Sequence, residues 1–178
     1  MSTGSGRGFF MIRRYVDGAN VVTGLNVVIG VLALQAALSR NFDVCVALVF
    51  VSTLLDHLDG WLARRFFSGH AARRAFGLQF DTLADLLNFD VVPALLLMAL
   101  APGAVSTGVG AALVLFGSVR LAHFNISTAG GGRHYLGLPT TFAGFVVVNL
   151  VLLQLAGAFG ILLLMGLALV VAFLQVAC

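Results

Sequence analysis

The sequence predicts an all-α protein that crosses a membrane several times. Of its 178 residues, 60% are hydrophobic and only 10% are charged, whereas a soluble domain carries about 25% charged residues. The hydrophobic residues come in runs long enough for membrane-spanning helices, which need roughly 20 apolar residues. Because only short connections separate these runs, we expect one domain of six transmembrane helices.

Six apolar runs define the expected spans. They cover residues 19–39, 42–63, 78–101, 103–124, 138–156 and 159–177. Ahead of this membrane domain (residues 19–178), residues 1–18 contain aromatic residues beside Arg13 and Arg14, which favours a short interfacial helix. Residues 1–39 also have features of a signal peptide. Their apolar run is long for one and further spans follow, so we expect a span there instead.

The arginines predict the orientation in the membrane. The chain has ten basic residues, all of them arginine, and nine fall on one side of the membrane if there are six spans; Arg40 is the exception. Positive residues mark the cytoplasmic side. We therefore expect a multi-pass protein of the cytoplasmic membrane with both termini and the polar loops in the cytoplasm. The sequence contains no aromatic-rich basic patch of the kind that binds nucleic acid.

The two cysteines do not predict a disulfide or a zinc site. Cys45 and Cys178 would lie near opposite faces of the membrane under this topology. The chain also has no CxxC motif, which argues against zinc.

Five of the seven acidic residues lie within one stretch of 35 residues; they are Asp56, Asp59, Asp81, Asp85 and Asp90. An aspartate at mid-membrane costs about 2.5–3.5 kcal/mol on insertion scales. Even near the interface, so many acids need cationic partners. Arg64 supplies one charge, and divalent metal is the natural source of the rest.

The spacing of four of these acids supports a metal site. Asp56 and Asp59 lie about 60° apart on a helix, and Asp81 and Asp85 stack on one face of the next. Oxygen ligands of this kind suit Mg²⁺, Mn²⁺ or Ca²⁺ rather than zinc. Four carboxylates balance two divalent ions, and paired metals serve phosphoryl displacement. The alternative, helix-end acids paired with nearby arginines, is less consistent with the spacing.

The residues next to the first pair of acids favour a phosphate-bearing ligand. Gly60 and Ala63 lie on the same helical face as the acids and leave the backbone open to a bulky ligand. Arg64 follows directly and could pair with a phosphate through two hydrogen bonds.

The complete pattern resembles the signature of the CDP-alcohol phosphotransferase family. Residues 56–64 read DHLDGWLAR and residues 77–85 read GLQFDTLAD, so all eight fixed positions of DxxDGxxAR and GxxxDxxxD are present. The spacer between the two halves, residues 65–76, is longer than is usual in the family. The family's six-helix membrane fold, usually dimeric, agrees with the expected spans.

This resemblance implies a role for each matching residue. Two metal ions, Mg²⁺ or Mn²⁺, would be held by Asp56, Asp59, Asp81 and Asp85, and Asp85 would also act as the general base. Four further positions would line the site of the CDP group: Gly60, Ala63, Arg64 and Gly77. Asp90 lies outside the signature, and we expect it to be solvated or paired with an arginine.

Further segments resemble the phosphatidylserine synthases within this family. Residues 81–94, the stretch RLAHFN at 120–125 and GLP at 137–139 look like the corresponding parts of those enzymes. Thr23 and Asn26 fit their N-terminal TxxN, and the resemblance implies that they contribute to cofactor binding beside the CDP residues. Arg120 and Asn125 would contact the acceptor or a lipid phosphate. Asp90, Val92, His123 and Thr141 depart from the usual residues near the expected acceptor pocket.

The sequence therefore predicts an enzyme that transfers the phosphatidyl group of CDP-diacylglycerol to the hydroxyl of L-serine and releases CMP. Two alternatives remain open. The first is the same chemistry with another alcohol, such as glycerol phosphate or an inositol phosphate. The second is a divalent-metal transporter, although such proteins usually place their ligands near the midplane at broken helices.

Overall fold

The computed structural model describes residues 18–66, 71–129 and 137–177, apart from a few side chains within these ranges. All regular secondary structure in these residues is helical, which confirms the predicted fold class. The elements are α2 (Gly18–Leu38), α3 (Phe42–Phe66), α4 (Ala71–Asp85), η1 (Leu86–Val91), α5 (Val92–Leu100), α6 (Ala104–Ala129), α7 (Thr140–Leu155) and α8 (Ile161–Leu174). The predicted interfacial helix falls within residues 1–18 and lies almost entirely outside the described residues.

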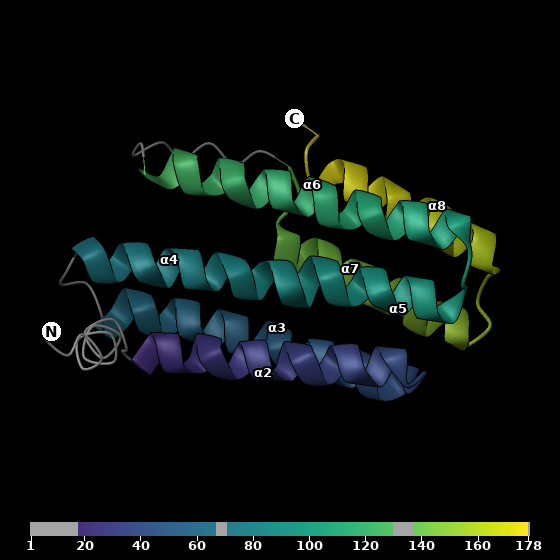
Figure 1. The fold of residues 1–178 in the computed structure, drawn as a ribbon, viewed down its shortest axis with the longest axis horizontal. Coiled ribbons are helices and arrows are strands. Elements are labelled where there is room, and N and C mark those ends of the chain that lie inside the picture. Colours follow the sequence, from purple (N-terminus) through teal and green to yellow (C-terminus); the bar gives the residue numbers. More distant parts are fainter. Residues whose placement is uncertain (1–17, 67–70, 130–136, 178) are drawn as a thin grey trace, which may run out of the picture.

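The helices lie side by side along the long axis of the molecule (Figure 1). α2 packs along α3, and α4, η1 and α5 form one unbroken helical run through the middle of the bundle. α6 runs back over this central helix. α7 and α8 form a shorter pair that covers only part of the bundle's length, so α3, α4 and α6 extend past the start of α7 (Figure 1).

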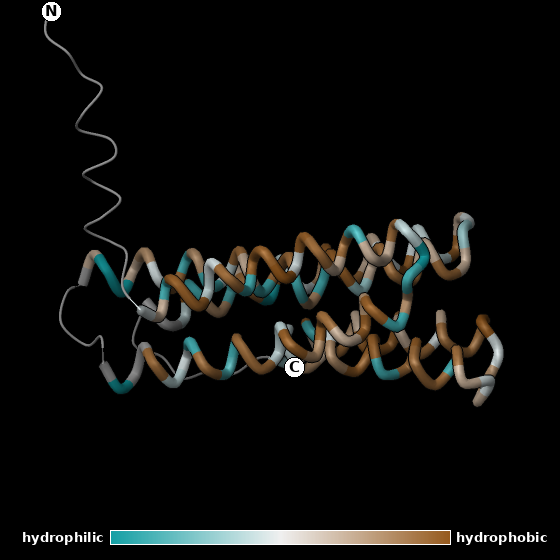
Figure 2. The backbone as a smooth tube through the Cα atoms, turned by 90° about the horizontal axis from the view of Figure 1, so that it is seen from below, coloured by the Kyte–Doolittle hydropathy of each residue, from teal (hydrophilic) through white to brown (hydrophobic). Residues whose placement is uncertain are grey.

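Three helices are long and apolar enough to cross a membrane, namely Gly18–Leu38, Ala72–Leu100 and Ala104–Ser127. Apolar helices 10–17 residues long cover Thr140–Leu155 and Ile161–Leu174. At 1.5 Å per residue, the longer of these two rises only about 24 Å, less than the roughly 30 Å of a bilayer's hydrocarbon core. The description as a polytopic membrane protein is thus confirmed, and the count of six spans stays a prediction. Hydrophobic residues dominate the helices over much of their length (Figure 2).

The helix ends differ from the predicted span ends at the arginine-rich side. α3 continues to Phe66, α4 begins at Ala71, and α6 continues to Ala129. Arg73 and Arg74, predicted to lie in a polar loop, are therefore on a helix. The physical reason is that arginine and alanine are good helix formers. A change from apolar to charged residues marks where a bilayer would end, but it does not end the helix.

A π-helix, η1, interrupts the central helix directly after Asp85. Its three buried residues Asn88, Phe89 and Asp90 each face a glycine of a different helix, respectively Gly30 of α2, Gly144 of α7 and Gly117 of α6. A β-carbon at any of these glycines would overlap its partner. The helices α2, α6 and α7 therefore pack closely against η1 from three sides. Small residues allow this close approach in membrane helix packing.

Candidate active site

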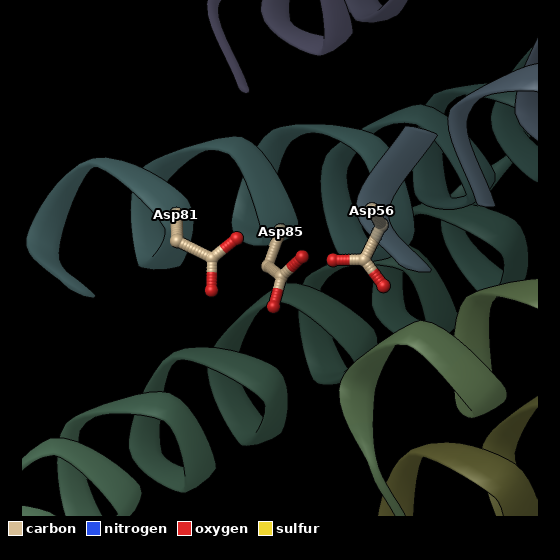
Figure 3. A group of neighbouring side chains, drawn as sticks. All are labelled: Asp56, Asp81 and Asp85. Carbon is tan, nitrogen blue, oxygen red and sulfur yellow. The ribbon is translucent and has the colours of Figure 1, made fainter. Parts of the chain in front are cut away.

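Three of the predicted aspartates converge in one place. Asp56 comes from α3, and Asp81 and Asp85 come from α4. One carboxylate oxygen from each lies within 4.8 Å of the others, and the three side chains share the space beside the central helix (Figure 3). We call Asp56, Asp81 and Asp85 the aspartate triad. The helical spacing of four residues places Asp81 and Asp85 on one face, as predicted from the sequence.

The triad suits a divalent cation. Its donors are all carboxylate oxygens, the ligands that Mg²⁺ and Mn²⁺ prefer. The Oδ1 atom of Asp85 is buried and has no hydrogen-bond partner among the described residues. A buried carboxylate oxygen without a partner is costly unless an ion or water completes it. The residues present therefore fit the metal that the sequence predicts.

Asp59 lies next to the triad but is held differently. Its side chain is buried with 4% exposure, and its Oδ2 accepts a hydrogen bond of 2.7 Å from Thr23 Oγ1 on α2. Asp59 is outside the group of oxygens that lie within 4.8 Å of one another. The role of Asp59 as a metal ligand stays a prediction. The hydrogen bond from Thr23 orients its carboxylate, which is one of the four in the signature.

The first turn of α7 contacts the site from the other side. Thr141 Oγ1 donates to Asp56 Oδ2 at 3.4 Å, and the adjacent Thr140 accepts a hydrogen bond of 3.0 Å from Arg120 Nη1. Thr140 was not among the predicted site residues, and its contact depends on where α7 begins, directly after Pro139.

Asn125 and Asn26, both predicted to contact ligands, have protein partners. Asn125 Oδ1 accepts a hydrogen bond of 3.1 Å from Thr82 Oγ1, so it joins α6 to α4 one turn from the triad. Asn26 Oδ1 accepts a 2.6 Å bond from Ser52 Oγ, and its backbone oxygen accepts one of 3.2 Å from Asn88 Nδ2. Asn26 is thus part of a buried network that ties α2, α3 and η1 together.

The residues predicted to line the CDP site lie along the same helices. Gly60 follows Asp59 on α3 and is half-buried. Gly77 lies one turn before Asp81 on α4, where a β-carbon would come within 3.2 Å of Asn20 Oδ1 of α2. Ala63 and Arg64 lie on α3, but their side chains are outside those that the structure describes. The roles of these four residues in nucleotide binding stay predictions.

Asp90 departs from one expectation. It is fully buried, with 0% exposure, so the solvated alternative is wrong. The charge of Arg120 acts on it, as in the paired alternative. Of the two cysteines, Cys45 is buried and free, and Cys178 lies outside the described residues.

Comparison with known proteins places this geometry in a family. Residues 17–174 match the family described as CDP-alcohol phosphatidyltransferase. An archaetidylserine synthase of Methanothermobacter thermautotrophicus is 31% identical over 138 residues, which are 76% of this chain and 58% of that protein. A CDP-diacylglycerol–serine O-phosphatidyltransferase of Helicobacter pylori is 36% identical over 139 residues, covering 76% of this chain and 57% of its own.

A third relative is more similar in length. A CDP-diacylglycerol–serine O-phosphatidyltransferase of Bacillus subtilis is 32% identical over 133 residues, which are 73% of this chain and 72% of that protein. The chain spans somewhat more than half the length of the other two relatives. The match over nearly the whole chain confirms the resemblance in the sequence, and the chain belongs to the CDP-alcohol phosphatidyltransferase family.

Proposed function

We propose that this protein transfers the phosphatidyl group of CDP-diacylglycerol to the hydroxyl of L-serine and releases CMP. The observation that carries the proposal is the aspartate triad, which brings both halves of the family signature to one space. The relatives named as serine transferases support serine as the acceptor. The chain works in the cytoplasmic membrane with its site toward the cytoplasm, where the nucleotide and serine are found. The family's usual homodimer stays an expectation.

Asp85 is the base in this reaction. It accepts the proton of the serine hydroxyl, and the oxygen forms a new bond to the lipid-side phosphorus. The bond from that phosphorus to the bridging oxygen breaks, and CMP leaves. The position of Asp85 on the central helix, with a buried Oδ1 that has no hydrogen-bond partner among the described residues, supports its role as the proton acceptor.

Asp56, Asp81 and Asp85, with Asp59 beside them, would hold the two divalent ions. Bound there, such ions neutralise charge on the pyrophosphate and so ease its cleavage. Thr23 and Thr141 orient two of the carboxylates through the hydrogen bonds described above. Such partners fix the direction of metal ligands.

Arg120 and Arg64 bind the anionic parts of the two substrates. Arg120 of α6 donates a hydrogen bond to Thr140 at the start of α7 and receives the carboxylate of serine. Arg64 follows the signature glycine by one helical turn and pairs with a phosphate of the nucleotide. Gly60, Ala63 and Gly77 leave room for the CDP group.

The test is acceptor choice by the purified full chain. CDP-diacylglycerol is supplied with labelled serine, glycerol 3-phosphate or an inositol phosphate, and CMP and labelled lipid are measured. We expect CMP release and lipid labelling with serine. Lipid labelling with another alcohol in place of serine would contradict the acceptor, and metal uptake into vesicles without any CMP release would favour a transporter.

A further inference from the structure

A second buried polar group lies next to the aspartate triad. It consists of Asp90 on η1, Arg120 on α6 and Gln175 at the end of α8, which we call the Asp90 cluster. Asp90 and Gln175 both have 0% exposure. Neither oxygen of Asp90, neither polar atom of the Gln175 amide, nor Arg120 Nε has a hydrogen-bond partner among the described residues. Buried polar groups of this kind require an explanation.

The π-helix turns Asp90 toward the side of the central helix on which Asp85 lies. The two residues are five apart, and on an α-helix they would point about 140° away from each other. A π-helix joins residues i and i+5 by a hydrogen bond, so residues five apart lie on the same side. The charge of Arg120 acts on both Asp85 and Asp90. Arg120 is therefore shared between the triad and the Asp90 cluster.

The backbone of α6 sets the distance between Asp90 and Arg120. The Asp90 carboxylate lies directly against Gly117, where a β-carbon would overlap it. Arg120 follows three residues later, and residues three apart are neighbours on a helix surface. Arg120 is also held by the hydrogen bond from Nη1 to Thr140. One neutral hydrogen bond and the negative charge of Asp90, which acts without an ion pair among the described residues, thus both bear on the same guanidinium group.

We propose that Asp90 is a positioning residue that supplies the counter-charge holding the Arg120 guanidinium beside Asp85, and thereby sets how tightly the carboxylate of the acceptor is bound. This inference rests on the proposed function, in which Arg120 receives that carboxylate. Asp90 is fully buried and acts through Arg120 without touching the acceptor. Fixing a long side chain before binding lowers the cost of ordering it when the ligand arrives.

The sharpest test is a double-mutant cycle of Asp90→Asn and Arg120→Gln, measured on the full chain with CDP-diacylglycerol and serine. Asp90→Asn is expected to raise the KM for serine by about 10- to 100-fold, the range seen when an outer partner of a ligand-binding group is lost. The KM for CDP-diacylglycerol should stay unchanged. In the Arg120→Gln background, Asp90→Asn should add nothing, because coupled residues are not additive. Additive effects, or equal effects on both substrates, would overturn the proposal.

Glycine variants on α6 test the same contact with every charge intact. Gly117→Ala pushes the Asp90 carboxylate aside, whereas Gly108→Ala adds the same methyl group to the same helix where nothing lies within 4 Å. Gly117→Ala should reproduce the rise in serine KM, and Gly108→Ala should not. If Asp90→Asn does not fold, this pair decides the question. Equal serine KM values for the two alanine variants would overturn the proposal.

The acceptor panel separates failure of this inference from failure of the proposed function. If the wild-type chain uses another alcohol, serine transfer is wrong, and the same cycle is measured on the KM of that alcohol. Coupling between the two substitutions then still supports the positioning role of Asp90. Additive substitutions overturn it whichever acceptor the enzyme uses.

Discussion

Asp85 and Asp56 belong to the same triad but differ in their surroundings. Asp56 Oδ2 accepts a hydrogen bond from Thr141, whereas Asp85 Oδ1 is buried and has no hydrogen-bond partner in the part of the chain that the structure describes. Asp85→Asn keeps the shape and one oxygen donor but cannot accept a proton. We expect it to bind CDP-diacylglycerol when metal is plentiful and to lose turnover by about 10²- to 10⁴-fold, the usual contribution of a positioned base. Binding curves and turnover rates check this.

Two other asparagine variants serve as comparisons. Asp56→Asn should weaken nucleotide binding more than Asp85→Asn does. Asp43→Asn makes the same chemical change at an exposed site in the first turn of α3 and should be neutral. Near wild-type turnover by Asp85→Asn with saturating metal would mean that another group is the base.

Thr23 affects the site through Asp59. Its hydroxyl donates a 2.7 Å hydrogen bond to that carboxylate, and Thr23→Val removes the donor while keeping the shape. Loss of such a partner usually costs 10- to 100-fold in metal affinity. We therefore expect the Mg²⁺ concentration for half-maximal activity to rise by about that factor. Thr53→Val is the control, because the Thr53 hydroxyl donates to Val49 O within its own helix, α3. An equal rise in the required Mg²⁺ concentration for Thr23→Val and Thr53→Val would contradict the role of Thr23 in orienting Asp59.

At the scale of single elements, η1 depends on the glycines that face it. Gly144 of α7 lies against the Phe89 backbone, and a β-carbon there would overlap it. Backbone cannot move aside as a flexible side chain can, so Gly144→Ala should destabilise the fold by about 1–3 kcal/mol. Gly166→Ala on α8, where nothing lies within 4 Å, is the matched control. Thermal unfolding in detergent measures the stability of both variants. Equal unfolding midpoints would show that η1 adapts to the added methyl group.

At the scale of the whole molecule, the triad unites α3 with α4 and brings three carboxylates together. Its negative charge must be balanced for function. We expect exhaustive chelation to abolish CMP release and Mg²⁺ or Mn²⁺ to restore it. Calcium, which takes longer bonds and more ligands, is added in a parallel sample, and its CMP release is compared with that restored by Mg²⁺ or Mn²⁺. Full activity after exhaustive chelation would rule out the metal site.

The orientation of the chain in the membrane is a further property of the whole molecule. Nine of ten arginines on one side predict cytoplasmic termini. A reporter fused after Cys178 should therefore read as cytoplasmic, with a reporter in the connection at Ala101–Gly103 as the opposite control. The short helices α7 and α8 make this test necessary. An external C-terminus would contradict the predicted topology, and the reporter at Ala101–Gly103 would then separate an odd number of crossings from six crossings in the opposite orientation.

Much of the fold and half of the site could be predicted from the sequence. Apolar runs locate the helices to within a few residues, and the spacing of Asp81 and Asp85 predicts their common face. The π-helix could not be predicted, because LLNFDV has no residue that marks a change of helix type. The contacts of Thr140 and Thr141 could not be predicted either. They depend on where α7 begins beside α3 and α6, and a local pattern does not encode that distance.

The π-helix also means that the central helix contains one residue more than a regular α-helix of the same length would hold. A π-turn closes one residue later than an α-turn, so η1 acts as a single-residue insertion between the catalytic and the apolar halves of that helix. Removing that residue would let the segment close as a regular α-helix of the same length, and Asn88, Phe89 and Asp90 could then no longer all face their glycines. A change of one residue between Asp85 and Pro93 is therefore expected to break the packing of η1 against α2, α6 and α7 rather than simply to lengthen or shorten a connection.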